Sequence, residues 1–282
     1  MLPVLLDLKF IKIYTFGVFL VLGFFWSAFL LWHNIRLTSY KEEDVFDGLF
    51  LSLFGGLFIG RLVYVVLNFN DFGFDILKFI LINGYPGISL IGAILGGIFT
   101  LFGFFGLKKI DFSEIIDYFI SPLFVALVFG KLGSFFSGAD VGSVTTFFLK
   151  IRYASFEGLR HLTAFYEAVF FAAAAYISYK LLFEIRKERL KKGILLMFFF
   201  WFFSLTYFIF DNLKERTLYL QGFSFNWLAS SLMLLTTSFY FIYHFRSNIG
   251  NFINQHGTAF KKIRLFPKRK TSQREGKKPP SN

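Results

Sequence analysis

The sequence predicts an all-α integral membrane protein with about seven transmembrane helices. Three observations indicate this fold class. Of the 282 residues, 55% are hydrophobic and 22% are aromatic, which is more apolar surface than a soluble domain of this size can bury. The apolar residues gather in stretches of about 20, the length that crosses a bilayer as a helix. Lysine and arginine gather in short connections between these stretches and in the C-terminal tail.

Seven apolar stretches are long enough to span a membrane. The predicted spans are 10–32, 48–68, 79–106, 113–136, 161–183, 194–213 and 227–244. The first is too long for a removable signal peptide and lacks a small-residue cleavage site, so we expect a true helix. The third and fourth contain Gly84, Pro86, Gly87 and Pro122, and we expect these spans to start late, to kink or to be partly re-entrant.

Small residues at a spacing of four predict close helix packing in two spans. Gly56 and Gly60 lie in the second span, and Gly92 and Gly96 lie in the third. Glycine removes the side chain that would hold two helix backbones apart. We therefore expect a compact bundle in which these helices approach closely.

Basic residues in the short connections predict the orientation of the chain. Arg36 and Lys41 follow the first span, Lys108 and Lys109 follow the third, and a basic run at 186–192 follows the fifth. With seven spans these connections and the basic tail lie on one side, which the positive-inside rule assigns to the cytoplasm. The prediction is an N-terminus outside and a C-terminus inside.

The chain divides into two parts by composition. Residues 1–246 form the predicted membrane domain, and residues 247–282 are polar, basic and contain several prolines. A segment of this composition cannot bury enough apolar surface to fold. We expect a disordered cytoplasmic tail that is attracted to anionic lipid headgroups.

Composition also excludes several function classes. The net charge of +12 does not indicate a nucleic-acid partner, because the positive residues occupy loops and the tail rather than one extended face. There is no cysteine, so disulfides, thiolate metal sites and an enzyme cysteine nucleophile are excluded. The histidines His33, His161, His244 and His256 lack metal-ligand spacing, and no Gly-x-Ser-x-Gly or phosphate-loop motif occurs. We expect no metal and no other cofactor.

Polar side chains from four spans are predicted to lie at one depth, near the outer headgroup boundary. They are Arg61 and Tyr64 in the second span, Lys131, Ser134 and Ser137 in the fourth, His161, Tyr166 and Glu167 in the fifth, and Asp211 and Lys214 at the end of the sixth. Charges inside spans are costly and usually functional. This cluster favours a pocket for an anionic lipid headgroup, since Arg and Lys both bind phosphate. The alternative is a structural network in which Arg61 pairs with Glu167 and His161 caps its helix.

Acidic residues at the inner side form a second polar set. They are Glu42, Glu43, Asp44, Asp47, Glu114 and Asp117. Asp44 and Glu114 come near predicted helix starts, where a carboxylate complements the helix dipole. We interpret this inner set as structural.

Five stretches, in order along residues 10–245, resemble the prolipoprotein diacylglyceryl transferase family. They are Phe16-Gly17 with Gly23, IGRLVYV at 59–65, GISLIGAILGG at 87–97, FGKLGSFFSGADVG at 129–142 and RHLTAFYE at 160–167. The resemblance implies transfer of a diacylglyceryl group from phosphatidylglycerol to the thiol of a prolipoprotein's lipobox cysteine, with glycerol phosphate leaving. It also implies a bacterial plasma (inner) membrane location.

The resemblance assigns roles to individual residues. It implies substrate binding by Arg61, Tyr64, Lys131, Ser134, Gly138, Gly142, Tyr166 and Glu167, and chemistry by Lys131 and His161. The chain departs from the family pattern at several of its positions. Lys131 stands in place of an Arg and Ser134 in place of an Asn, while Ile91 occupies the place of the proposed catalytic His and Tyr207 that of an Arg. Ala139 replaces a Glu, with Asp140 next to it.

These departures leave two functions open. The first is a divergent transferase whose partners are phosphatidylglycerol, or another anionic phospholipid, and a prolipoprotein signal peptide with its lipobox cysteine. The second is a non-catalytic membrane protein of the same fold that binds an anionic lipid or a lipoprotein precursor. A small transporter is disfavoured, because the charges gather toward one face of the membrane and not at its midplane.

Overall fold

The computed structural model describes residues 2–8, 11–36, 38–82, 84–153, 156–215, 219–220 and 222–246. Within them, seven helices are long and apolar enough to cross a membrane. These are α1 (Thr15–Ile35), α2 (Glu42–Leu67), α5 (Leu90–Leu107), α6 (Phe112–Ser137), α7 (Thr163–Arg186), α8 (Ile194–Phe210) and α9 (Phe225–His244). The predicted all-α class and the seven spans are confirmed. The predicted basic tail, 247–282, lies outside the described residues.

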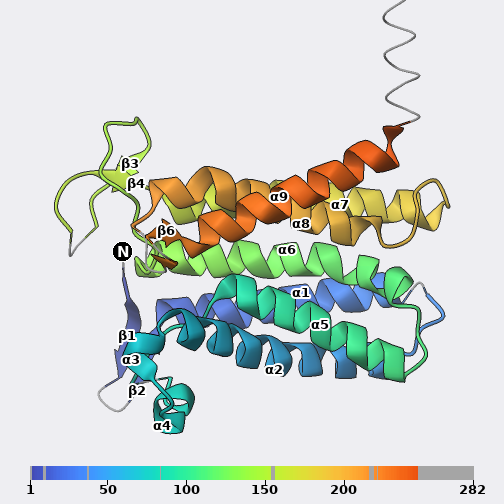
Figure 1. Cartoon of the computed structure of the whole chain (residues 1–282), viewed down its shortest axis with the longest axis horizontal. Helices are drawn as coiled ribbons and strands as arrows, with labels where there is room; N and C mark the ends of the chain where they lie inside the picture. The colour runs from blue at the N-terminus through green and yellow to red at the C-terminus, as the bar shows by residue number, and fades with distance from the viewer. Residues whose placement is uncertain are drawn as a thin grey trace, which may run out of the picture. The chain divides into compact units, whose positions relative to one another are not determined.

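Short elements connect the long helices. The helical ones are α3 (Phe69–Phe72), α4 (Ile76–Ile80) and the 3₁₀ turn η1 (Asp211–Leu213). The strands are β1 (Val4–Leu8), β2 (Ile11–Tyr14), β3 (Lys150–Ile151), β4 (Arg160–His161), β5 (Tyr219–Leu220) and β6 (Phe223–Ser224), which pair as three antiparallel hairpins. All three hairpins lie at one end of the bundle formed by residues 1–237, called here the hairpin end (Figure 1).

The first transmembrane helix begins later than the sequence predicts. Residues 11–14 lie in β2, where Leu6 pairs with Ile13 and Asp7 pairs with Lys12. The prediction that the first span starts at residue 10 is therefore wrong. Ile11, Ile13 and Tyr14 are β-branched or aromatic, and such residues favour a paired strand when a partner strand is available.

The third span starts late, as expected. Its predicted range begins within α4, and α5 starts only at Leu90. Pro86 and Gly87 separate the two helices, and Gly87 has a φ of 144°, which a helix cannot accept. Ser89 caps the new helix, because its Oγ accepts a hydrogen bond from the Gly92 amide at 3.2 Å.

Helix α6 runs through Pro122 without ending. Proline has no amide hydrogen, so the Tyr118 carbonyl one turn earlier lacks its usual donor. The Asn34 side chain of α1 donates to that carbonyl at 3.4 Å. This contact satisfies the carbonyl where α1 packs along α6.

Helices α2 and α5 pack closely against each other, and glycines lie at their points of contact (Figure 1). A Cβ atom added at Gly60 would lie 2.9 Å from the Ala93 Cβ, and one added at Gly92 would lie 2.9 Å from the Val63 Cβ. Any side chain at these positions would push the two backbones apart. The predicted close approach is confirmed.

Ion pairs and a helix cap tie together the connections at the other end of the bundle. Lys108 pairs with Asp44 at 2.7 Å, and Lys192 pairs with Glu114 at 2.7 Å. The buried Asp117 carboxylate accepts hydrogen bonds from the Gly193 and Leu195 amides and so caps α8. Asp44, Glu114 and Asp117 thus make structural contacts, as the interpretation of the inner acidic set expects.

Candidate functional site

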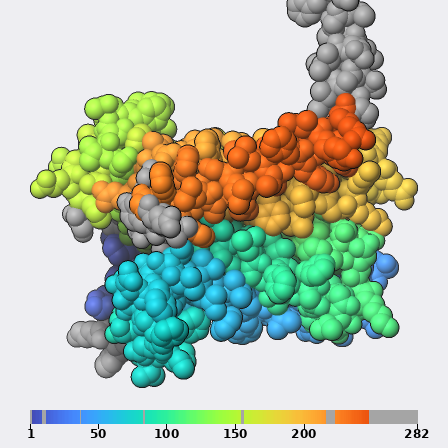
Figure 2. Space-filling model, viewed as in Figure 1, coloured from blue at the N-terminus to red at the C-terminus, as the bar shows by residue number. Residues whose placement is uncertain are grey.

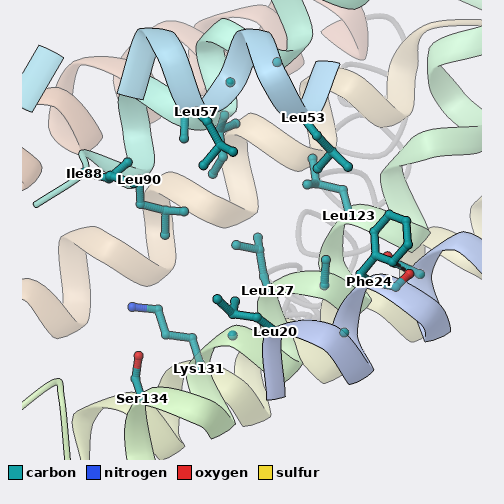
Figure 3. A pocket seen from close by; sticks show the side chains of 18 of the residues that line it. Leu20, Phe24, Leu53, Leu57, Ile88, Leu90, Leu123, Leu127, Lys131 and Ser134 are labelled. Atoms are coloured by element: carbon teal, nitrogen blue, oxygen red, sulfur yellow. Dashed lines mark hydrogen bonds between the residues drawn. The ribbon is translucent and has the colours of Figure 1, made fainter. Parts of the chain in front are cut away.

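A cavity of about 810 Å³ lies between the α2–α5 pair and the α1–α6 pair. Its walls are mostly apolar. Figure 3 shows Leu20 and Phe24 from α1, Leu53 and Leu57 from α2, Leu123 and Leu127 from α6, and Ile88 and Leu90 at the start of α5. Lys131 and Ser134 follow on α6 toward the hairpin end. The cavity therefore joins a long apolar space to a polar end.

The polar end is centred on a buried carboxylate that bridges two ammonium groups. Glu167 Oε2 lies 2.9 Å from Lys131 Nζ, and Glu167 Oε1 lies 2.6 Å from Lys214 Nζ. Glu167 is fully buried, whereas both lysines line the cavity. Burying charges is tolerated only when they are paired in this way. The two lysines present positive charge to the cavity, and Glu167 stands behind them.

Asp140 adds a second carboxylate to Lys131. Its Oδ2 lies 3.1 Å from Lys131 Nζ, and its side chain is one-third exposed. The Lys131 ammonium beside it holds the pKa of the Asp140 carboxyl at about 2. Asp140 therefore stays ionised across the physiological range and keeps Lys131 charged.

Tyr207 of α8 lies against both lysines. The centroid of its ring is 5.3 Å from Lys131 Nζ and 4.9 Å from Lys214 Nζ. The ring is buried and lines the cavity. Cations close to an aromatic face are stabilised by its quadrupole. The ring thus contributes a neutral contact that helps to hold the two ammonium groups.

Lys214 has a different environment from Lys131, since Glu167 is its only ion-pair partner among the described residues. Burial, and then the positive charge of Lys131, lowers the pKa of the Lys214 ammonium. Lys214 is therefore the cation of this site that loses its proton more readily as the pH rises.

Asp211 lies at the cavity on the same helical face as Tyr207, which precedes it by four residues. It is 3% exposed, and its Oδ2 accepts a hydrogen bond from Ser224 Oγ at 2.5 Å. In the described part of the chain, Asp211 forms no ion pair. Asp211 is therefore a carboxylate at the cavity wall to which none of the described cationic side chains is bound.

Backbone pairing at the hairpin end brings these residues together. The segment 139–145 after α6 pairs on one side with the residues after α8, through Glu215 N to Val141 O (3.0 Å) and Ser143 N to Leu213 O (2.8 Å). On its other side it pairs with β4, through His161 N to Ser143 O (3.1 Å). This pairing fixes Asp140 and Lys214 next to the end of α6.

Two of the predicted site glycines permit this backbone arrangement. Gly138 ends α6 in the left-handed region, with a φ of 76°. A Cβ atom at Gly142 would collide with the His161 carbonyl oxygen. Both glycines are therefore needed for the backbone path of this segment, and their part in substrate binding stays a prediction.

Arg61 and Tyr64 are not at the cavity wall. The Arg61 guanidinium donates to three carbonyl oxygens, those of Lys78 (2.7 Å), Gly87 (2.8 Å) and Phe79 (3.0 Å). The alternative expectation that Arg61 pairs with Glu167 is wrong, because the two lysines occupy that carboxylate. The Tyr64 ring packs on Gly87.

His161 and Tyr166 also lie away from the cavity lining. The His161 ring lies between Phe147 and Tyr166, with ring centroids 6.0 and 6.3 Å away. Its Nδ1 is buried without a hydrogen-bond partner among the described residues, and no side chain caps α7, so the alternative that His161 caps its helix is wrong. The Tyr166 hydroxyl donates to the Leu149 carbonyl at 2.6 Å.

Of the predicted site residues, the structure thus brings Lys131, Ser134 and Glu167 together. It adds Tyr207, Asp140 and Lys214, which the sequence-based assignment leaves out. The sequence already predicts Lys214 and Asp211 in the polar cluster at the end of the sixth span, and both line the cavity, but the family resemblance assigned no role to Lys214. No group of three His, Asp or Glu side chains in the described ranges is arranged to hold a metal ion.

Comparisons with known proteins agree with the sequence resemblance. A family model described as prolipoprotein diacylglyceryl transferase matches residues 3–243. A relative from Clostridium botulinum (strain 657 / Type Ba4) is 29% identical over 258 residues, which is 87% of this chain and 99% of the relative. One from Clostridium tetani is 26% identical over 175 residues (60% and 69%), and one from Ehrlichia ruminantium is 25% identical over 240 residues (82% and 90%). All three are named phosphatidylglycerol–prolipoprotein diacylglyceryl transferase.

Proposed function

Because this chain belongs to the prolipoprotein diacylglyceryl transferase family, we propose that it transfers a diacylglyceryl group from phosphatidylglycerol to the lipobox cysteine of a prolipoprotein. One observation carries the proposal at this site. The ammonium groups of Lys131 and Lys214 stand together at the polar end of an otherwise apolar cavity. An anionic phospholipid has the matching distribution of charge and apolar surface.

The lipid would lie with its acyl chains along the apolar walls and its phosphate at the two lysines. A cavity of this volume falls within the range of ligand sites, and its leucines and phenylalanines suit hydrocarbon. Lysine binds phosphate as a compact charge, and the low-polarity surroundings strengthen the attraction. Ser134 lines the same region and supplies a hydroxyl. We place this end in the outer leaflet of a bacterial plasma membrane, with the N-terminus outside.

The chemistry requires the thiol to lose its proton, one bond to form at its sulfur and one bond to break at the glycerol carbon. The cysteine sulfur forms a bond to the glycerol carbon of the diacylglyceryl group, and the bond from that carbon to the phosphate oxygen breaks. The electron pair stays on the phosphate, which leaves as glycerol phosphate. Lys131 and Lys214 stabilise the charge that develops on the leaving phosphate. Glu167 positions the two lysines for this purpose.

A reconstituted transfer assay tests this function. The full chain, purified and placed in phosphatidylglycerol vesicles, is given a synthetic lipobox peptide, and the product is identified by mass spectrometry. We expect a thioether-linked diacylglyceryl peptide, and none when the lipobox cysteine is replaced by serine. Folded protein that forms no thioether would refute the proposal.

The Lys131→Ala variant tests whether this ammonium group holds the lipid. We expect it to lose both transfer and retained phosphatidylglycerol, while the matched control Lys108→Ala, at the other end of the bundle, keeps both. The alternative of a non-catalytic lipid-binding protein rests on Ile91 and Tyr207, which stand where the family pattern has a His and an Arg. Retained lipid without thioether in the unaltered protein would favour that alternative.

A further inference from the structure

The transfer reaction needs a group that removes the proton of the acceptor thiol, because the thiolate is the nucleophile. No histidine lines the cavity in the described part of the chain. The ionisable side chains that do line it are Lys131, Asp140, Tyr207, Asp211, Lys214 and Glu215. This inference rests on the proposed function, and these six groups are the candidates for the proton acceptor.

Most of these groups are poor proton acceptors in their environments. Asp140 is paired with Lys131, which keeps its pKa near 2. Glu215 is paired with Arg160, and half of its side chain is exposed. The two lysines carry the charge that the leaving phosphate needs. Glu167, behind them, is fully buried, with each oxygen paired to an ammonium group.

We propose that the Asp211 carboxylate accepts the proton of the lipobox thiol. It lines the cavity, is almost fully buried, and forms no ion pair with the described residues. Its Oδ2 receives the Ser224 hydroxyl at 2.5 Å, which fixes the orientation of the carboxylate. A base held in this way can meet a thiol that enters the polar end of the cavity.

The balance of charge supports this assignment. Before transfer, Asp211 and the lipid phosphate each carry one negative charge, and the thiol is neutral. The thiol proton moves to Asp211, the sulfur bonds to the glycerol carbon, and the carbon–oxygen bond breaks. Afterwards Asp211 is neutral, the thioether is neutral, and glycerol phosphate leaves with two negative charges. Negative charge thus moves from Asp211 toward Lys131 and Lys214.

The test compares peptides whose acceptor is cysteine or selenocysteine, in the full chain with phosphatidylglycerol vesicles. A selenol ionises at neutral pH without a base, so it bypasses the step assigned to Asp211. We expect Asp211→Asn to slow transfer to the cysteine peptide on the order of 100-fold, the scale of general-base catalysis. Transfer to the selenocysteine peptide should stay within a few-fold of the unaltered protein. A merely structural role would slow both peptides equally.

Two further variants keep the result interpretable. Asp211→Glu keeps a carboxylate but moves it. For this variant, the transfer rate with the selenocysteine peptide divided by the rate with the cysteine peptide should exceed the same ratio for the unaltered protein. This measurement remains available if Asp211→Asn does not fold. Ser224→Ala keeps the carboxylate and should lose less activity than Asp211→Asn. Equal loss on both peptides, or unchanged ratios in both Asp211 variants, overturns the inference. If the unaltered protein forms no thioether with the cysteine peptide and no selenoether with the selenocysteine peptide, the proposed function itself is refuted.

Discussion

At the scale of single residues, Glu167 shows how a membrane protein keeps two lysines charged away from water. An ion taken out of water loses several kcal/mol of hydration, and only close opposite charge offsets that loss. Each carboxylate oxygen of Glu167 contacts one ammonium group, at 2.9 Å for Lys131 and 2.6 Å for Lys214. Asp140 supplies Lys131 with a second partner. The site thus depends on a few close contacts.

Replacing Glu167 by glutamine should therefore destabilise the protein strongly. The variant leaves two buried ammonium groups with too little negative charge, and breaking a buried ion pair costs about 3–5 kcal/mol. Thermal unfolding in detergent measures the loss. The matched control is Glu184→Gln on the same helix, whose carboxylate pairs with the exposed Lys187 and Arg189. A loss for Glu167→Gln no larger than that of the control would contradict the expected role.

Lys214 should give phosphate binding its pH dependence. Burial and Lys131 lower the pKa of Lys214, so as the pH rises it becomes neutral before an ordinary lysine would. Retention of phosphatidylglycerol by the protein should therefore decline as the solution becomes alkaline. Lys214→Arg keeps its charge at all these pH values and should remove the decline. Retention that falls along the same pH curve in both proteins would show that another group titrates.

At the scale of elements, one side chain makes three hydrogen bonds to the segment from α4 to the start of α5. Arg61 of α2 holds it through the carbonyls of Lys78, Phe79 and Gly87, and Ile82, Gly87 and Ile88 contribute to the cavity wall. Figure 2 shows α3 and α4 standing out from the surface at the hairpin end. The Arg61 side chain is 2% exposed and anchors this protruding segment to α2.

Arg61→Met should loosen this segment while leaving the seven helices intact. The variant removes the donors to all three carbonyls, so amide hydrogen exchange across residues 76–82 and 84–88 should accelerate. Arg61→Lys should rescue little, because one ammonium cannot reproduce the planar guanidinium that reaches three separate carbonyls. The exposed Arg152→Met serves as the control. Unchanged exchange in Arg61→Met would show that other contacts hold the segment.

At the scale of the whole molecule, the membrane accounts for the exposed apolar surface. Side chains such as Phe54 and Phe99 are 71% and 74% exposed on the long helices. Lipid tails solvate such surface, whereas water does not. The hairpin end holds the candidate site, and the opposite end holds the basic connections. The positive-inside rule predicts that this opposite end faces the cytoplasm.

The absence of native cysteine makes this orientation directly testable. Glu157→Cys introduces a thiol at the hairpin end, and Glu188→Cys introduces one in the connection between α7 and α8. In intact cells, a membrane-impermeant maleimide should label Glu157→Cys and should label Glu188→Cys only after the membrane is opened. The reverse pattern would invert the predicted topology.

The sequence by itself determined the membrane class, the seven spans and the positions on two helices where close packing is possible. These follow from composition, span length and glycine spacing, which are properties local to the chain. The sequence also placed Lys131, Ser134 and Glu167 at one depth, since depth follows from position along a helix that rises 1.5 Å per residue.

Only the tertiary structure decided which side chains meet at that depth. Arg61 binds carbonyls in and after α4, and His161 lies among aromatic rings. Around Lys131 lie Tyr207, Asp140 and Lys214. Depth does not fix the rotation of a helix about its axis or the neighbour it faces, and packing sets both. Asp140 and Lys214 lie beyond the helix ends, where pairing between distant segments places them.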